Sequence, residues 1–167
     1  KVWYAGPNFR YEKPQTGRYR QFDQVGVEVL GVDDPYLDVE VIALAMRFYG
    51  ALGLRQVTLL VNSLGNPDER TRYVEALRAH FEANLDALTP ESRQTLLKNP
   101  LRVLDSKREG DAELVAAAPH IAEFYSDETG AHFDKVCAGL RALDVEFVVA
   151  SRLVRGLDYY RRTTFEF

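Results

Sequence analysis

Alternating polar residues near the start of the chain could form one binding surface. The run 22–28 places Phe22, Gln24, Gly26 and Glu28 two residues apart, so a strand would present all four on the same face. An aromatic ring can stack on a nucleobase, and amide or carboxylate oxygens can accept hydrogen bonds from an ammonium group. A glycine between two such groups leaves room for a ligand to approach the backbone.

A second polar face lies in the segment just before this one. Asn8, Arg10 and Glu12 alternate with aromatic residues. An arginine can bind a phosphate through two parallel hydrogen bonds. The segment between the two faces contains three cations that could reach trailing phosphates or a nucleic-acid backbone, namely Lys13, Arg18 and Arg20. The residues alone leave two interpretations equally open: a nucleotide-binding sheet face, or a surface hairpin whose polar side simply meets water.

A third group of chemically suitable residues lies in Leu153-Val154-Arg155-Gly156-Leu157-Asp158-Tyr159-Tyr160. A fixed guanidinium such as that of Arg155 can stabilise the charge that develops on a transferring phosphoryl group. Taken alone, the octapeptide favours a simpler interpretation, in which an exposed arginine is followed by two tyrosines that pack in a sheet.

Together these segments resemble one enzyme family. The run Gly6-Pro7-Asn8-Phe9-Arg10-Tyr11-Glu12, continued to Phe22, resembles motif 2 of the class II aminoacyl-tRNA synthetases. The continuation Gln24-Val25-Gly26-Val27-Glu28 is similar to that of the histidine enzymes, and 153–160 resembles the signature peptide of the histidyl-tRNA synthetases without a gap. The segment 99–107 resembles part of the insertion in the bacterial-type enzymes. The resemblance extends along nearly the whole chain.

The resemblance implies an ATP site on the first segment. Arg10 would bind the α-phosphate of ATP and the carboxylate of the amino acid, and it would be one of two catalytic residues. Glu12 would help to hold the adenine, Phe22 would be the platform on which the adenine stacks, and Arg18 would add a further contact to ATP.

The resemblance also implies a histidine site next to the ATP site. Gln24 and Glu28 would contact the histidine substrate, and Tyr159 and Tyr160 would line the pocket for its imidazole. Arg155 would be the second catalytic residue, placed near both the histidine and the α-phosphate, where it promotes formation of the adenylate.

The activity so implied is ATP-dependent activation of histidine to histidyl-adenylate and transfer of histidine to tRNA(His), by a homodimer. Magnesium would come with ATP, whereas no other metal is expected, because the sequence lacks paired Cys/His spacing. Two non-catalytic alternatives stay open: the synthetase-like regulatory subunit of ATP phosphoribosyltransferase, and the synthetase-like tRNA-binding module attached to a kinase. The first is disfavoured because the residues of both implied sites are present. A kinase domain elsewhere in the gene would identify the second.

Periodicity and capping signals predict the elements that must position these residues. Segments 2–12 and 21–31 should form a hairpin, and a helix should begin after Asp34-Pro35 and stop at Gly53. Capping signals at Asn66-Pro67, Thr89-Pro90 and Ser126 predict further helices. Shorter helices are predicted near 111–117 and 119–125, and strands at 56–61, 145–150 and in the final segment to 167.

This order of elements predicts an α+β fold: a mainly antiparallel, class II synthetase-like sheet with flanking helices and a helical insertion domain. We divide the chain into a catalytic-core part at 1–65, the insertion at 66–144, and a second core part at 145–167. In the family the insertion helps to clamp the tRNA acceptor arm. We therefore expect its removal to spare histidine activation and to impair transfer to tRNA.

The composition sets broad limits on the protein. Its net charge of −4 is uneven, with +2 in residues 1–31, +2 in residues 151–167 and −8 between them. No apolar run approaches the roughly 18–20 residues of a membrane span. The single Cys137 cannot form an internal disulfide, which favours a reducing, cytoplasmic setting. Both ends resemble the middle of a strand, so we expect the chain to be part of a longer enzyme.

Overall fold

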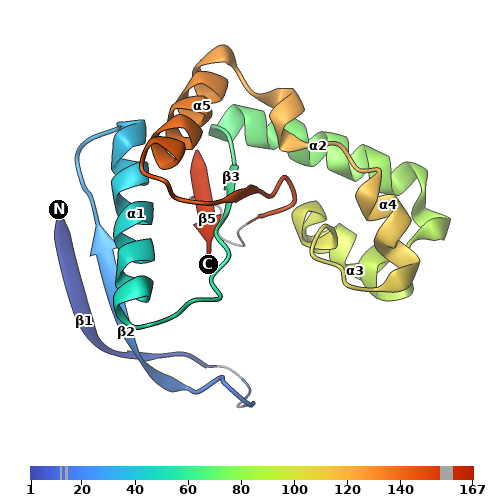
Figure 1. Ribbon diagram of the computed structural model, residues 1–167. Coiled ribbons are helices and arrows are strands. Elements are labelled where there is room, and N and C mark those ends of the chain that lie inside the picture. The colour runs from blue at the N-terminus through green and yellow to red at the C-terminus, as the bar shows by residue number, and fades with distance from the viewer. Residues whose placement is uncertain (12, 14, 155–159) are drawn as a thin grey trace.

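The computed structural model describes residues 1–11, 13, 15–154 and 160–167 (Figure 1). A two-stranded hairpin lies beside a long helix, a small sheet occupies the centre, and a lobe of helices extends to one side (Figure 1). The predicted α+β class is confirmed, and two of the three strand pairs are antiparallel.

The hairpin consists of β1 (Val2–Phe9) and β2 (Gln21–Glu28), paired antiparallel with Asn8 opposite Phe22. A bridge between Gln15 and Arg18 closes its connection, where Gly17 adopts a φ of 77° that favours glycine. The second strand is shorter than the predicted 21–31 and ends before Gly31, whose φ of 83° is incompatible with an extended strand.

The helix α1 (Pro35–Ala51) begins and ends where the capping signals predicted. The side chain of Asp34 accepts a hydrogen bond of 2.8 Å from the backbone N–H of Tyr36, and proline occupies the first helical turn. Gly53 follows the helix with a φ of 79°. One side of α1 is buried through Val39, Ile42 and Ala43.

The central sheet has the order β4 (Val148–Val149), β3 (Leu60–Ser63), β5 (Thr163–Glu166). The strand β3 pairs parallel with β4 and antiparallel with β5. The strand predicted at 56–61 is found at 60–63. The strand predicted at 145–150 has only two residues, 148 and 149. The apolar pattern missed Asn62 and Ser63, which are buried polar residues of the strand.

The remaining helices follow the capping signals. Asn66 and Glu69 form the predicted capping box at the start of α2 (Pro67–Ala83), and Ser126 caps α5 (Asp127–Ala142). Between them lie α3 (Pro90–Lys98) and α4 (Ala112–Ala116), joined by single 3₁₀ turns. The segment 119–125, predicted as a helix, forms only a 3₁₀ turn. The described 3₁₀ turns span Leu85–Ala87, Pro100–Val103, Glu109–Asp111 and Ile121–Phe124.

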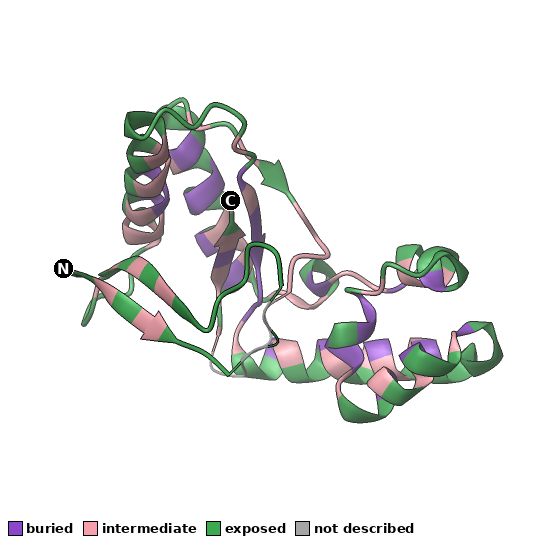
Figure 2. Cartoon of the chain, turned by 90° about the horizontal axis from the view of Figure 1, so that it is seen from below, coloured by how far each residue is buried: buried purple, intermediate pink, exposed green. Residues whose placement is uncertain are grey.

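Buried residues occur both in the helical lobe and around the central sheet (Figure 2), and those described form two separate cores. One lies wholly within residues 73–121 of the helical lobe. The other joins α1, β3 and α5, and there Gly139 of α5 lets the helices approach so closely that an added Cβ would lie 2.8 Å from Val39. The division at 66–144 stays a prediction, but this packing favours an insertion that ends near residue 124, with α5 in the core.

A buried carboxylate organises the far end of the helical lobe. Asp111 is fully buried and accepts hydrogen bonds from the backbone N–H of Thr89 at 2.8 Å and from the hydroxyls of Ser92 and Ser106 at 2.5 Å each. Thr89 makes no side-chain cap for α3, and Asp111 instead binds the backbone N–H of this N-cap residue. Burial alone would raise the pKa of Asp111, but the hydrogen bonds from Ser106, Ser92 and Thr89 outweigh it and lower the pKa to about 2.

We expect Asp111→Asn to destabilise the helical lobe by about 2 kcal/mol near neutral pH, because an amide accepts fewer of these bonds. The lowered pKa means that the carboxylate stabilises the fold above its unfolded-state value of 3.8 and loses this effect as the pH falls towards 2. The difference between variant and wild type in thermal unfolding should therefore shrink below about pH 4. Asp86→Asn, an exposed change in the same lobe, is the control. An equal loss in both variants would contradict the expectation.

Candidate active site

The hairpin brings four of the predicted site residues together. In its register Asn8, Gly6 and Tyr4 lie opposite Phe22, Gln24 and Gly26, and the side chains of directly opposed residues lie on the same face of a hairpin. Phe22 and Gln24 are partly buried and Glu28 is exposed. The predicted polar face is thus a single surface shared by both strands.

Arg10 lies at one end of this face, just beyond β1. Its backbone N–H donates a hydrogen bond of 2.8 Å to the carbonyl of Arg20, which continues the pairing of the strands. Its guanidinium carbon lies 4.7 Å from the centroid of the Phe22 ring, a cation–π contact. The two residues assigned to phosphate and adenine are therefore adjacent, and the guanidinium covers the aromatic ring in this structure.

The backbone of Gly26 is not open to a ligand, contrary to the prediction. The side chain of Tyr4 lies directly across it, and a Cβ at this position would overlap the tyrosine ring. Glycine is needed here to admit a neighbouring side chain, whereas we had predicted room for a ligand to reach the backbone. Tyr4 therefore belongs to the face between Gln24 and Glu28, and counting back in twos from Arg10 would have found it.

Three predicted site residues, Glu12, Arg155 and Tyr159, lie outside the described residues. Tyr160 is partly buried, and its backbone carbonyl accepts a hydrogen bond of 3.1 Å from the guanidinium of Arg70 in α2. Arg18 is exposed in the turn of the hairpin. The hairpin thus brings together Arg10, Phe22, Gln24 and Glu28. Tyr160, at the end of the signature peptide, is bound instead to α2.

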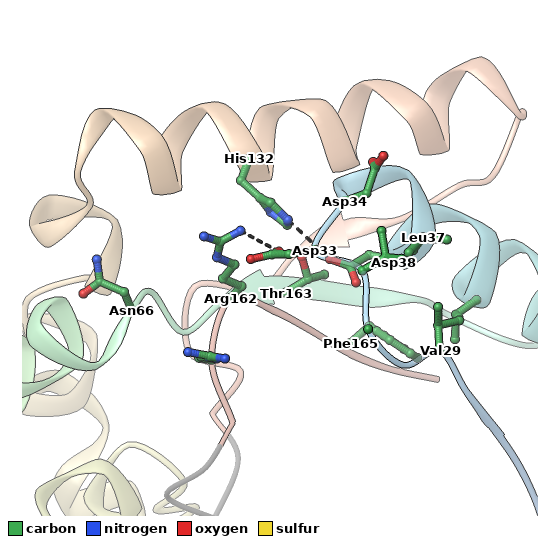
Figure 3. A pocket seen from close by; sticks show the side chains of 14 residues that line it. Val29, Asp33, Asp34, Leu37, Asp38, Asn66, His132, Arg162, Thr163 and Phe165 are labelled. Carbon is green, nitrogen blue, oxygen red and sulfur yellow. Dashed lines mark hydrogen bonds and ion pairs between the residues drawn. The ribbon is translucent and has the colours of Figure 1, made fainter. Parts of the chain in front are cut away.

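A cavity of about 550 Å³ lies between the start of α1, α5 and the start of β5 (Figure 3). None of the predicted site residues that the structure describes lines it. His132, which is 8% exposed, points towards Asp38 with 3.8 Å between its Nε2 and the carboxylate, and burial raises the pKa of Asp38 (Figure 3).

Arg162, which lines this cavity, forms ion pairs with two carboxylates. Its guanidinium donates a hydrogen bond of 2.8 Å to Asp33, in the loop before α1 (Figure 3). A second bond of 2.8 Å goes to Glu128, at the start of α5. The backbone of Arg162 adopts a left-handed φ of 56° and exchanges hydrogen bonds of 2.7 and 2.8 Å with Leu64 and Gly65. The cluster therefore fixes the point at which the chain returns to the sheet, which is a structural role.

The described residues contain no group of three or more histidine, cysteine or acidic side chains that could hold a metal ion. Among the same residues, no helix is long and apolar enough to cross a membrane.

Comparison with known proteins identifies the family. A family model described as histidyl-tRNA synthetase matches residues 1–167. The chain is 53% identical to a histidine–tRNA ligase of Geobacillus thermodenitrificans over 166 residues, which cover 99% of the chain and 39% of that protein. A histidine–tRNA ligase of Levilactobacillus brevis is 54% identical, with coverage of 99% and 38%.

A solved structure agrees with the sequence comparisons. The chain superposes on apo histidyl-tRNA synthetase of Staphylococcus aureus with a TM-score of 0.72 and 37% identity, over 98% of the chain and 37% of that protein. The fold is thus that of the matching part of a histidyl-tRNA synthetase. The chain belongs to the histidyl-tRNA synthetase family, and it spans about two fifths of the length of the relatives it matches.

The left-handed backbone of Arg162 gives a prediction. A side chain other than glycine costs about 1–2 kcal/mol in this conformation, while ion pairs with exposed carboxylates stabilise a fold by about 0–1 kcal/mol each. We expect Arg162→Gly to unfold at a higher temperature than Arg162→Ala, since both lose the ion pairs but only alanine keeps the strain. Thermal unfolding of the full-length variants checks this. A more stable alanine variant would show that the backbone is not strained.

Proposed function

We propose that the full-length protein is a histidine–tRNA ligase, which activates histidine with ATP and transfers it to tRNA(His). The hairpin face carries this proposal, with a phosphate-binding Arg10 stacked on Phe22 at one end and a carboxylate, Glu28, at the other. Six residues of strand span about 20 Å, which is room for adenine, phosphate and an amino acid in line. The family membership supports the same function.

In the first step, a carboxylate oxygen of histidine attacks the α-phosphorus of ATP, and pyrophosphate leaves. Arg10 binds both the attacking carboxylate and the phosphate, so it aligns the two reactants. Arg155 stabilises the negative charge that grows on the phosphoryl oxygens. For adenine to stack on Phe22, the Arg10 guanidinium turns from the ring towards the phosphates. Glu12 and Arg18 complete the ATP site in this proposal.

Histidine is held at the opposite end of the face. Gln24 and Glu28 accept hydrogen bonds from its cationic groups, and Tyr159 and Tyr160 line the imidazole pocket. The ring of Tyr4, which lies across Gly26 between these two acceptors, adds a flat wall to this subsite. In the second step a ribose hydroxyl of the tRNA terminus attacks the carbonyl carbon of the adenylate, and AMP leaves.

The proposal implies further partners. Magnesium accompanies the ATP phosphates and helps to neutralise their charge. The full-length protein is proposed to be a cytoplasmic homodimer, in which the helical insertion contacts the acceptor arm of the tRNA.

Exchange of labelled pyrophosphate into ATP tests the proposal directly. The purified full-length protein should catalyse exchange that depends on histidine and not on other amino acids, and it should charge tRNA(His). A folded, dimeric protein without histidine-dependent exchange would overturn the proposal and favour a non-catalytic synthetase relative.

We expect Arg155→Ala to lower kcat for exchange by roughly a hundredfold to a thousandfold, because one donor to developing charge is lost. The KM for ATP should change less than about threefold, since this donor acts mainly in the transition state. Exchange rates within about threefold of the wild type would remove Arg155 from the mechanism.

A second substitution tests the histidine end of the face. Glu28→Gln should lower kcat/KM for histidine by about tenfold or more, because a neutral amide cannot balance a cationic substrate group. Parameters for ATP should stay nearly unchanged. Asp23→Asn, on the opposite face of β2 and exposed, is the matched control and should behave like the wild type. Equal changes in the kinetic parameters for ATP and for histidine would mean that Glu28 has only a structural role in β2.

A further inference from the structure

The peptide that leads into the signature segment is attached to the helical insertion. The guanidinium of Arg152 donates hydrogen bonds of 2.8 Å and 2.9 Å to the carbonyls of Ala116 and Ala118, at the end of α4. Val154, immediately before the signature arginine, packs against the buried core of the insertion. These contacts join a catalytic-core segment to a lobe that sequence analysis had treated as separate.

The sheet holds the same peptide from its other side. Asn62 of β3 is 3% exposed, and its amide nitrogen lies 3.0 Å from the carbonyl of Leu153 and 3.4 Å from that of Ser151. The entry to the signature segment is therefore fixed between the central sheet and the insertion.

The exit from the signature segment is also tied to the insertion. Arg70, in the first turns of α2, donates its 3.1 Å hydrogen bond to the carbonyl of Tyr160. Only residues 155–159 separate this anchor from Val154, and a chain of n residues spans at most about 3.5 Å per residue. The two anchors therefore restrict where this short segment can lie.

The chemistry of Arg152 points to a positioning role rather than to stability alone. Its Nη1 is buried and makes no hydrogen bond with any described residue. A buried donor without a partner costs stability, so a side chain that served only to stabilise the lobe would be better replaced by an apolar one. What the arginine does provide is a pair of directed contacts between two segments.

We propose that Arg70 and Arg152 are positioning residues, through which the insertion holds both ends of the signature peptide and so sets the place of Arg155 at the α-phosphate. This inference rests on the proposed function. It also revises an expectation from the sequence: removal of the insertion should impair histidine activation as well as tRNA charging, because it takes away Arg70 and the two carbonyls that Arg152 contacts.

Point variants of the full-length protein test the inference. Arg70→Ala and Arg152→Ala should lower kcat for histidine-dependent exchange at least tenfold, with KM for ATP and histidine within threefold of the wild type. Arg152→Lys should recover part of the rate, because its ammonium can still donate to a carbonyl. Arg72→Ala is the matched control: Arg72 lies on the same helix and donates to the carbonyl of Phe124 at 2.9 Å, a contact within the insertion. It should stay within twofold of the wild type.

Hydrogen exchange of the backbone amides gives a readout that does not need activity. Amides of 151–162 should exchange about tenfold faster in both alanine variants and at the wild-type rate in Arg72→Ala, with α5 unchanged in all of them. An inactive wild type would overturn the proposed function, while faster exchange confined to 151–162 would still support the tethering. An active wild type with alanine variants of equal kcat would overturn the inference. So would a loss of protection that extends equally to α5, since that is a general structural effect.

Discussion

The backbone pairing of β3 with β5 is the constraint on which the rest of the molecule depends. It places Asn62 opposite Thr164, about a hundred residues further along the chain. Between these two residues the chain leaves the sheet for the helical lobe and α5, and it returns to the sheet through β4 and β5. The same strand, β3, holds the chain on both sides of the signature peptide. It pairs with β4, which comes before that peptide, and with β5, which comes after it.

Polar side chains at the base of the insertion secure this return. The carboxylate of Glu69, which is 1% exposed, accepts hydrogen bonds from the backbone N–H of Asn66 at 2.8 Å and of Ser126 at 2.7 Å. It thereby joins the first turn of α2 to the residue that caps α5. Burial would raise the pKa of Glu69, but these bonds lower it, so the carboxylate stays ionised at neutral pH. The hydroxyl of Tyr125 adds a bond of 2.7 Å to the carbonyl of Ser63.

The two candidate catalytic arginines therefore depend on different parts of the fold. Arg10 lies on a hairpin whose shape is set by local pairing and by a glycine turn. The ends of the signature peptide are held by α2, α4 and β3, which belong to the insertion and the sheet. In the proposed reaction the two arginines act on one phosphate, so the insertion becomes part of what aligns the catalytic groups.

The sequence by itself determined the features that depend on neighbours a few residues away. Alternation along 22–28 gave the polar face, and capping residues such as Asp34, Asn66 and Ser126 marked where helices begin, because a cap acts within one turn. The motifs that resemble the family predicted the class of fold, which the comparisons confirmed.

Only the tertiary structure decided which distant segments meet. An apolar stripe on α5 shows that one face is buried, but not that it packs on α1 and β3. The same holds for Arg70 and Arg152, since the partners of their guanidinium groups are backbone carbonyls, which leave no pattern in the sequence. The physical reason is that periodicity and capping report local geometry, whereas these contacts exist only after strands a hundred residues apart have paired.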